Sequence, residues 1–462
     1  MLRSRSLLTA GSLLLSGALA ENWAVIIASS CGYDNYRHQA DAHHAYALLV
    51  EQGIPLDNII FFACDDIAYH EDNPFQGEIF NEPNGDNVYD PDSIDYTGDD
   101  VNAEKFMAVM MGDAKGANGK VLRSTIEDNV FLFFVDHGAP GILAFPGPDD
   151  KHPFSFFYAD QLMDTFEYMY THRMFKEMVV YVEACEAGSM FVDMPEDMNI
   201  YVMTASDEEV SSWAIYCDEE AIIDGKDLGT CLGDLFSINW MNDTVNHIGD
   251  KRTLLAQYHH VKEETRENEE LDRKGSPVCT YGDLGIQSRS SLEDFQAGQF
   301  FEKKTPAVSY SNNILGYLLG FTPKLDVSEQ EESTWDTYTK PNANKPKVNS
   351  RDAKLHFLMG RYNSSQGMFA HDDLANEIRH RMALDTAFFS LFPDIYEQDG
   401  HTFTLNIPSR KVTDFDCLRF LMESFENKCM PFSEYGLGHV KYIVEFCETK
   451  TTSDIVDKAM DM

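Results

Sequence analysis

The stretch Met178-Val179-Val180-Tyr181-Val182-Glu183-Ala184-Cys185-Glu186-Ala187-Gly188-Ser189 decides the fold class of this chain. Its first half is a short, continuous apolar run, which is typical of a strand buried on both faces of a sheet. The run ends in small residues around a cysteine, where a nucleophile would stand. Because ligands bind outside the carboxyl ends of parallel strands, we expect Cys185 at the functional edge of such a sheet.

A second apolar run, Val130–Val135, ends in the same way, at Asp136-His137-Gly138. Two such strands would bring a thiol and an imidazole to one edge of the sheet. The thiol needs this base because the thiolate is the attacking species, and an unperturbed cysteine is mostly protonated at neutral or acidic pH. Asn35 follows the first strand, so Asn35, His137 and Cys185 are predicted to share one site. The simpler alternative is that each is a packing residue.

Further apolar runs alternate with stretches of helical periodicity, Gln39–Gln52 and Ala159–Tyr170. Strands that alternate with helices predict an α/β fold with an open, mostly parallel sheet flanked by helices. The remaining predicted strands are Trp23–Ala28, Ile59–Ala63 and Ile200–Thr204.

Composition changes along the chain predict four segments. Residues 1–20 have the pattern of a secretory signal, with arginines, an apolar stretch and the small-residue ending Ala18-Leu19-Ala20. A catalytic domain is expected over 21–321. The polar, proline-containing stretch 322–350 predicts a linker and activation region, and the helical spacing of apolar residues over 351–462 predicts a separate helical domain.

Charge and cysteine content restrict the partners and the compartment. The formal net charge of -41 argues against nucleic acid, because phosphate binding needs clustered Lys and Arg. No run after the signal is long and apolar enough for a membrane span. The 9 cysteines are an odd number, so at least one thiol is expected to be unpaired in an oxidising lumen. The loop Gly85–Asp100 lacks the spacing of a calcium loop and is interpreted as solvated, so no metal or cofactor is expected.

The strand ends quoted above belong to a larger set of distinctive stretches, which covers about residues 22 to 260. The set consists of Asp34-Asn35-Tyr36-Arg37-His38-Gln39-Ala40-Asp41-Ala42, Asp65-Asp66-Ile67-Ala68-Tyr69, Asp95-Tyr96-Thr97-Gly98, Asp136-His137-Gly138, Glu183-Ala184-Cys185-Glu186, Gly188-Ser189-Met190 and Ser237-Ile238-Asn239-Trp240-Met241. Together these stretches resemble the legumain family, the asparaginyl endopeptidases, which are caspase-like cysteine peptidases of lysosomes and vacuoles.

The resemblance implies a role for each residue of the site. Cys185 would be the nucleophile, His137 its base, and Asn35 would orient the histidine. The amides of Gly138 and Cys185 would form the oxyanion hole, which must donate to the oxygen that becomes charged during attack.

The resemblance also implies a pocket for an asparagine side chain. A carboxamide offers one acceptor and one donor, so Arg37 would bind its oxygen while Glu183 and Asp234 accept from its nitrogen. The alternative for Arg37 and Glu183 is a plain ion pair at a strand end. The other residues expected to bind substrate are His38, Ser211 and Ser212.

The C-terminal region resembles the inhibitory prodomain of the same family, most clearly from Asp416-Cys417-Leu418 to Phe446-Cys447. Family members release this cap in acid and cut themselves after asparagine. From residue 351 the region holds 12 Lys and Arg against 18 Asp and Glu, so an acid switch would depend on local pairs, with Arg379 and Arg381 as candidates. The candidate cleavage sites are Asn342, Asn344, Asn349 and Asn363, and the candidate glycosylation sites are Asn242 and Asn363.

The leading hypothesis is a zymogen of a cysteine endopeptidase that cleaves after asparagine, and more weakly after aspartate at acidic pH, through a thioester. Its partners would be peptides with asparagine before the cut bond and its own prodomain, in a lysosome or vacuole or outside the cell. One alternative is a peptide ligase, in which an amine resolves the thioester. Another is a catalytic subunit like that of glycosylphosphatidylinositol transamidase, and from a different class an inactive binding protein.

Overall fold

The protein was examined as a computed structural model. It describes residues 20–301 except 150–151, 268–273 and 300, and it describes 347–462 except 364–367, 394–396, 400–401, 405–409, 452–453, 455–457 and 459–462. The predicted signal and most of the predicted linker therefore lie outside the described residues. Within the described residues, no helix is long and apolar enough to cross a membrane.

A six-stranded sheet forms the centre of the fold, in the order β13-β8-β7-β3-β1-β2. Five strands are parallel, and β13 at the edge is antiparallel to β8. All five predicted strands are confirmed within a residue or two. The strands are β1 Asn22–Ala28, β2 Ile59–Phe62, β3 Asn129–Val135, β7 Glu177–Glu183, β8 Ile200–Thr204 and β13 Cys279–Gly282.

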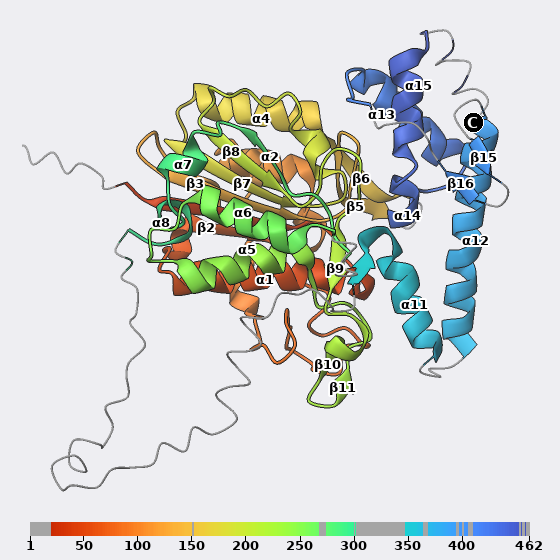
Figure 1. The fold of residues 1–462 in the computed structure, drawn as a ribbon, viewed down its shortest axis with the longest axis horizontal. Coiled ribbons are helices and arrows are strands. Elements are labelled where there is room, and N and C mark those ends of the chain that lie inside the picture. Colours follow the sequence, from red (N-terminus) through yellow and green to blue (C-terminus); the bar gives the residue numbers. More distant parts are fainter. Residues whose placement is uncertain are drawn as a thin grey trace, which may run out of the picture.

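Helices cover both faces of this sheet because alternate strand residues face opposite sides and both sides are apolar. Ala24 and Ile26 join one buried core with Trp240, whereas Val25 and Ile27 join the other with Phe166. Figure 1 shows α4 over one face and α1, α5 and α6 over the other. The helices are α1 Tyr36–Glu51, α2 Ala103–Met110, α3 Ala114–Ala117, α4 Ala159–Thr171, α5 Leu235–His247, α6 Leu254–Thr265, α7 Ile286–Arg289 and α8 Glu293–Gln296. The predicted α/β class is confirmed.

Two small sheets extend the main one. β4 (Gly138–Ala139), β5 (Ile142–Asp149) and β6 (His152–Tyr158) form an antiparallel sheet directly after His137. β9 (Trp213–Ile215) lies between β12 (Gly233–Asp234) and β14 (Lys347–Asn349), and β14 is antiparallel to it. A two-stranded pair, β10 (Ile222–Ile223) and β11 (Lys226–Asp227), stands apart.

The C-terminal region is helical, as predicted, and stands beside the sheet in Figure 1. Its core is shared with the small sheet of the catalytic region, because Ile142 and Tyr158 pack in one buried cluster with Leu384, Phe388 and Leu421. A disulfide joins α13 to α15. The elements are α11 Ala353–Asn363, α12 Met368–Leu391, β15 Glu397–Asp399, β16 Thr402–Thr404, α13 Phe415–Lys428, α14 Glu434–Leu437 and α15 Val440–Thr449.

Candidate active site

Strand register brings the predicted histidine and cysteine to the same edge of the sheet. β3 and β7 are parallel, and Val135 is paired with Glu183. His137 and Cys185 therefore each follow this pair by two residues. A Cβ atom on Gly138 would lie 2.2 Å from the carbonyl oxygen of Cys185, so only glycine fits this close approach.

The hydrogen bond between His137 and Asn35 determines where the imidazole carries its proton. Asn35 donates through Nδ2 to the Cys31 carbonyl, and its Oδ1 lies 2.9 Å from His137 Nε2. A carbonyl oxygen can only accept, so Nε2 is the protonated nitrogen and Nδ1 holds the lone pair. Among the described residues, Nδ1 has no hydrogen-bond partner. Burial lowers the pKa of His137 to about 3, so the ring is neutral and can accept a proton.

The Cys185 thiol is buried, with 1% of the residue exposed, and its Sγ lies 3.6 Å from Ser212 Oγ. Burial raises the pKa of this thiol above its usual value because a low-dielectric site disfavours the thiolate. The structure therefore presents a protonated and covered nucleophile.

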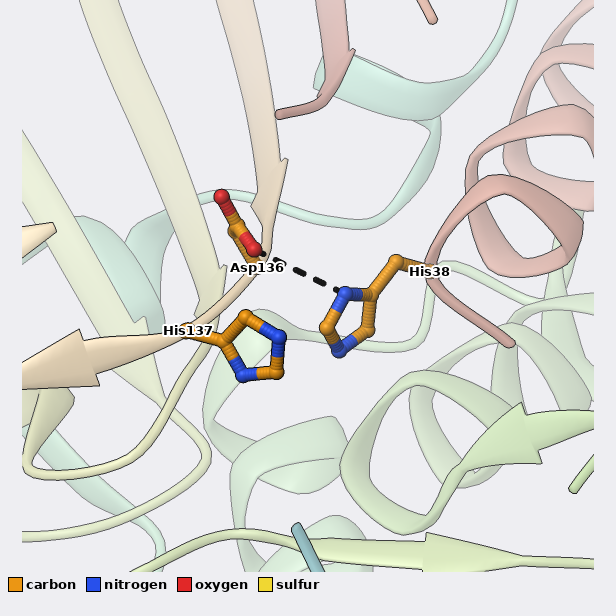
Figure 2. A group of neighbouring side chains, drawn as sticks. All are labelled: His38, Asp136 and His137. Carbon is orange, nitrogen blue, oxygen red and sulfur yellow. Dashed lines mark ion pairs between the residues drawn. The ribbon is translucent and has the colours of Figure 1, made fainter. Parts of the chain in front are cut away.

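His38 and Asp136 lie beside His137, as Figure 2 shows. The His38 and His137 rings are nearly perpendicular, with centroids 4.9 Å apart. Ser29 donates to Asp136 Oδ2 at 2.7 Å, and burial raises the pKa of this carboxyl to about 8. Among the described residues, these three are the one group whose nitrogens and carboxylate oxygen lie close enough together to hold a metal ion.

Arg37, Glu183 and Asp234 are fully buried, and their charges interact. Arg37 Nε donates to Asp234 Oδ1 at 3.0 Å, and the backbone amide and hydroxyl of Ser237 donate to Glu183 Oε2. One polar atom of each charged residue has no hydrogen-bond partner within the described part of the chain: Arg37 Nη2, Glu183 Oε1 and Asp234 Oδ2. One free donor and two free acceptors match the hydrogen-bonding groups of a carboxamide.

Asp41 supports this cluster and was not singled out from the sequence, although it lies in the quoted stretch that begins at Asp34. Its carboxyl accepts from the Asp234 backbone amide and, through Oδ1, from Asn81 Nδ2 at 2.7 Å. Burial, followed by repulsion from Asp234, raises the pKa of Asp41 well above its usual range. Buried carboxyls around a single arginine cannot all be ionised, so the cluster holds protons. Ser211, which was also predicted to bind substrate, is half-buried beside the buried Ser212.

The C-terminal region covers the site with an extended segment and an arginine. β14 adds to the edge of β9, and the Ser350 amide donates to the Ser212 carbonyl at 3.1 Å. Arg351 then reaches the Gly138 carbonyl and the Glu186 carboxylate with one guanidinium nitrogen. No pattern in the sequence identified Arg351, because both of its partners are distant in the chain.

A lysine of α11 closes the other side of the site. Lys354 Nζ lies 3.5 Å from Asp34 and 3.9 Å from Glu434, which begins α14. Although burial raises it, the nearby Lys354 ammonium group holds the pKa of Glu434 at about 2. Both carboxylates therefore share one ammonium group.

The pairs that the sequence suggested for an acid switch lie elsewhere. Arg381 bonds Glu377 and Asp352, and Arg379 bonds Asn376, all within the C-terminal region. Both arginines lie on α12, and the side-chain partners described for them belong to the C-terminal region, so these pairs do not join it to the catalytic region. Among the predicted cleavage and glycosylation sites, Asn349 is half-buried in β14, Asn242 is half-buried, Asn363 is exposed, and Asn342 and Asn344 lie outside the described residues.

Comparisons with known proteins identify the family of the chain. The model of the peptidase C13 family matches residues 22–298, and the legumain prodomain model matches 372–462. The vacuolar-processing enzyme beta-isozyme of Arabidopsis thaliana is 35% identical over 95% of this chain and 85% of its own length. Legumain of Canavalia ensiformis is 34% identical over 95% of this chain and 87% of its own length.

A vacuolar-processing enzyme of Citrus sinensis is 36% identical over 94% of this chain and 82% of its own length. A solved caspase-1 structure from Spodoptera frugiperda aligns with 57% of this chain and 88% of that chain at 10% identity and a TM-score of 0.31. The family match covers more than half of the chain and includes the strand ends described above. The chain therefore belongs to the peptidase C13 family and is a legumain-like cysteine endopeptidase with a C-terminal prodomain.

Proposed function

We propose that this peptidase cleaves after asparagine and that its C-terminal region keeps it inactive until acid releases it. The observation that carries the proposal is the set of unpartnered atoms on Arg37, Glu183 and Asp234. A site with buried donors and acceptors rejects side chains that cannot pair with them, by about 10⁴-fold where the whole set is lost. An asparagine amide would satisfy one donor and at least one acceptor.

The catalytic steps follow from the hydrogen bonds around His137. Its Nδ1 lone pair takes the proton of Cys185 as the sulfur attacks the peptide carbonyl. The imidazolium then gives this proton to the departing amine, and a thioester remains on the sulfur. Water activated by the same nitrogen resolves the thioester. Asn35 keeps Nε2–H engaged throughout, so Nδ1 stays available as the base.

The amides of Gly138 and Cys185 are proposed to form the oxyanion hole. The contact between these two residues leaves no room for a side chain at position 138, which favours close approach of the substrate backbone. Ser211 and Ser212 would line the wall of the pocket, and His38 would support it from behind through Asp234, whose Oδ2 lies 3.6 Å away.

Inhibition is proposed to come from occupation of the peptide-binding edge. β14 pairs with β9 as an added strand, the mode in which extended peptides bind sheet edges. Arg351 binds the Gly138 carbonyl beside the nucleophile, so substrate and prodomain would compete for the same volume. The match to vacuolar-processing enzymes supports delivery to a vacuole or lysosome, where acid would release this segment.

The test compares the full chain with Cys185→Ser after incubation at about pH 4 to 5. The parent chain is expected to cleave peptides after asparagine and to acquire a new C-terminus that follows an asparagine, read by mass spectrometry. The variant should do neither. A new C-terminus that does not follow asparagine would refute the specificity, and undiminished cleavage by Cys185→Ser would refute the nucleophile.

A further inference from the structure

One imidazole and one carboxyl lie beside the proposed base. One ligand atom from each of His38, Asp136 and His137 lies within 4.8 Å of the others, and all three residues are buried. Figure 2 shows the two rings edge to face beside the Asp136 carboxyl. The proposed catalytic cycle uses only His137, so the proximity of the other two requires its own explanation.

The spacing of the donor atoms suits a small divalent ion. His38 Nδ1 lies 3.6 Å from Asp136 Oδ1. Ligands at the usual zinc distances of about 2.0 to 2.1 Å stand roughly 3.4 Å apart in a tetrahedron, so this pair is nearly in place. A ligand atom of His137 lies within 4.8 Å of a ligand atom on each of the other two residues, so His137 would be the third ligand.

A further observation points to a ligand at this place. Asp136 Oδ1 is buried and has no hydrogen-bond partner within the described residues, although it faces His38. His38 Nε2 lies 3.6 Å from Asp234 Oδ2, which is beyond hydrogen-bond distance. Ser30, 2.7 Å from His38 Nδ1, must turn its hydroxyl for the ion to bind.

The donor set also favours a particular kind of ion. Two imidazoles and one carboxylate favour Zn²⁺ over Ca²⁺ or Mg²⁺, which prefer all-oxygen sites.

We propose that His38, Asp136 and His137 form a binding site for Zn²⁺ or a similar divalent ion, and that the bound ion inhibits the peptidase. Coordination through His137 Nε2 moves the ring proton to Nδ1, and coordination through Nδ1 uses its lone pair. Either way Nδ1 can no longer accept the Cys185 proton. The inhibition rests on the proposed role of His137 as the base, whereas the binding does not.

The binding test uses the full chain with Cys185→Ser, which cannot process itself and lacks the competing thiol. Equilibrium dialysis against Zn²⁺ for a day allows the buried site to open and close many times. We expect one Zn²⁺ per chain to bind tightly and to resist displacement by Ca²⁺. In this background Asp136→Asn and, separately, His38→Gln should each lower the affinity for this Zn²⁺ by about 100-fold or more. Loss of a residue that merely orients a metal ligand already lowers affinity by about 10- to 100-fold. Metal-free thermal unfolding checks the fold of each variant.

A matched control removes another histidine that has an acidic neighbour. His247 and His260 are partly exposed and each lie 3.8 Å from the buried Asp243, so these three residues are the rival site. His260→Asn should leave the tightly bound Zn²⁺ unchanged. Loss of this Zn²⁺ in His260→Asn, or its persistence in folded Asp136→Asn and His38→Gln, would overturn the proposed site. So would the absence of any tightly bound Zn²⁺.

Two further measurements separate this inference from the proposed function. Co²⁺ bound to the unmutated chain should show no thiolate charge-transfer band that disappears in Cys185→Ser, since Cys185 is outside the ligand set; such a band would place the ion on the Cys185 sulfur and overturn the proposal. Zn²⁺ should inhibit the acid-activated chain, and a chelator should restore cleavage. Binding at this site with undiminished cleavage would overturn the inhibition and the assignment of His137 as the base, while the metal site itself would stand.

Discussion

Arg351 offers a direct test of how the C-terminal region holds the peptidase inactive. Its guanidinium bonds the Gly138 carbonyl, the Glu186 carboxylate and the Glu434 carbonyl, and it is almost completely buried. Replacement by alanine leaves the Glu186 charge buried without its partner. Removal of one member of a buried ion pair typically costs about 3 to 5 kcal/mol.

The lower end of this range already predicts a large effect. If docking of the C-terminal region weakens by about 3 kcal/mol, the uncapped population rises by roughly 100-fold, because each 1.36 kcal/mol is a factor of ten. Arg351→Ala should therefore cleave an asparagine-containing fluorogenic peptide at neutral pH without acid treatment. Initial rates, taken before self-cleavage proceeds, measure this increase. Arg351→Lys keeps the positive charge but loses the planar guanidinium that forms two hydrogen bonds at once. Its initial cleavage rate at neutral pH should therefore lie between the rates of the parent chain and of Arg351→Ala.

Arg379→Ala is the matched control, since this exposed arginine lies in the same region and bonds only Asn376 among its described contacts. It should remain as inactive at neutral pH as the parent chain. Acid treatment should activate the parent chain and both alanine variants to the same final rate. The reasoning fails if folded Arg351→Ala is as inactive as Arg379→Ala before acid treatment.

The other predictions concern the pocket, the acid response and the loop before α1. Arg37→Ala should lower kcat/KM for asparagine substrates about 10- to 100-fold, the equivalent of one hydrogen bond to a charged group, with little change in alkylation of the thiol; equal losses would assign Arg37 to the fold. The docked pKa of Glu434 is about 2 against an ordinary 4.5, so its contribution to docking is complete above pH 4.5 and decreases as the pH falls toward 2. Glu434→Gln should therefore flatten the pH dependence of the activation rate in that window, and an unchanged slope would contradict this. Loss of the Cys31–Cys64 disulfide in a double serine variant should lower kcat more than KM, because the Cys31 carbonyl holds the Asn35 amide; an unchanged kcat would remove this positioning role.

Much of the catalytic region was predictable from local pattern. Continuous apolar runs identified all five parallel strands, because strands buried on both faces of a sheet have no polar side. The polar turns after those runs identified Asn35, His137 and Cys185, since strand ends at one edge of a parallel sheet lie close together. What remained a prediction was the chemistry of each residue.

The sequence by itself thus determined the order of the elements and which side chains stand at the functional edge. Only the tertiary structure decided which atoms remain unpartnered, that Arg351 reaches Gly138 and Glu186, and that His38 and Asp136 lie together beside the base. The physical reason is the separation of the interacting residues along the sequence. Periodicity reflects contacts between residues a few positions apart. Hydrogen bonds in this site join residues separated by up to 213 positions, which no local pattern encodes.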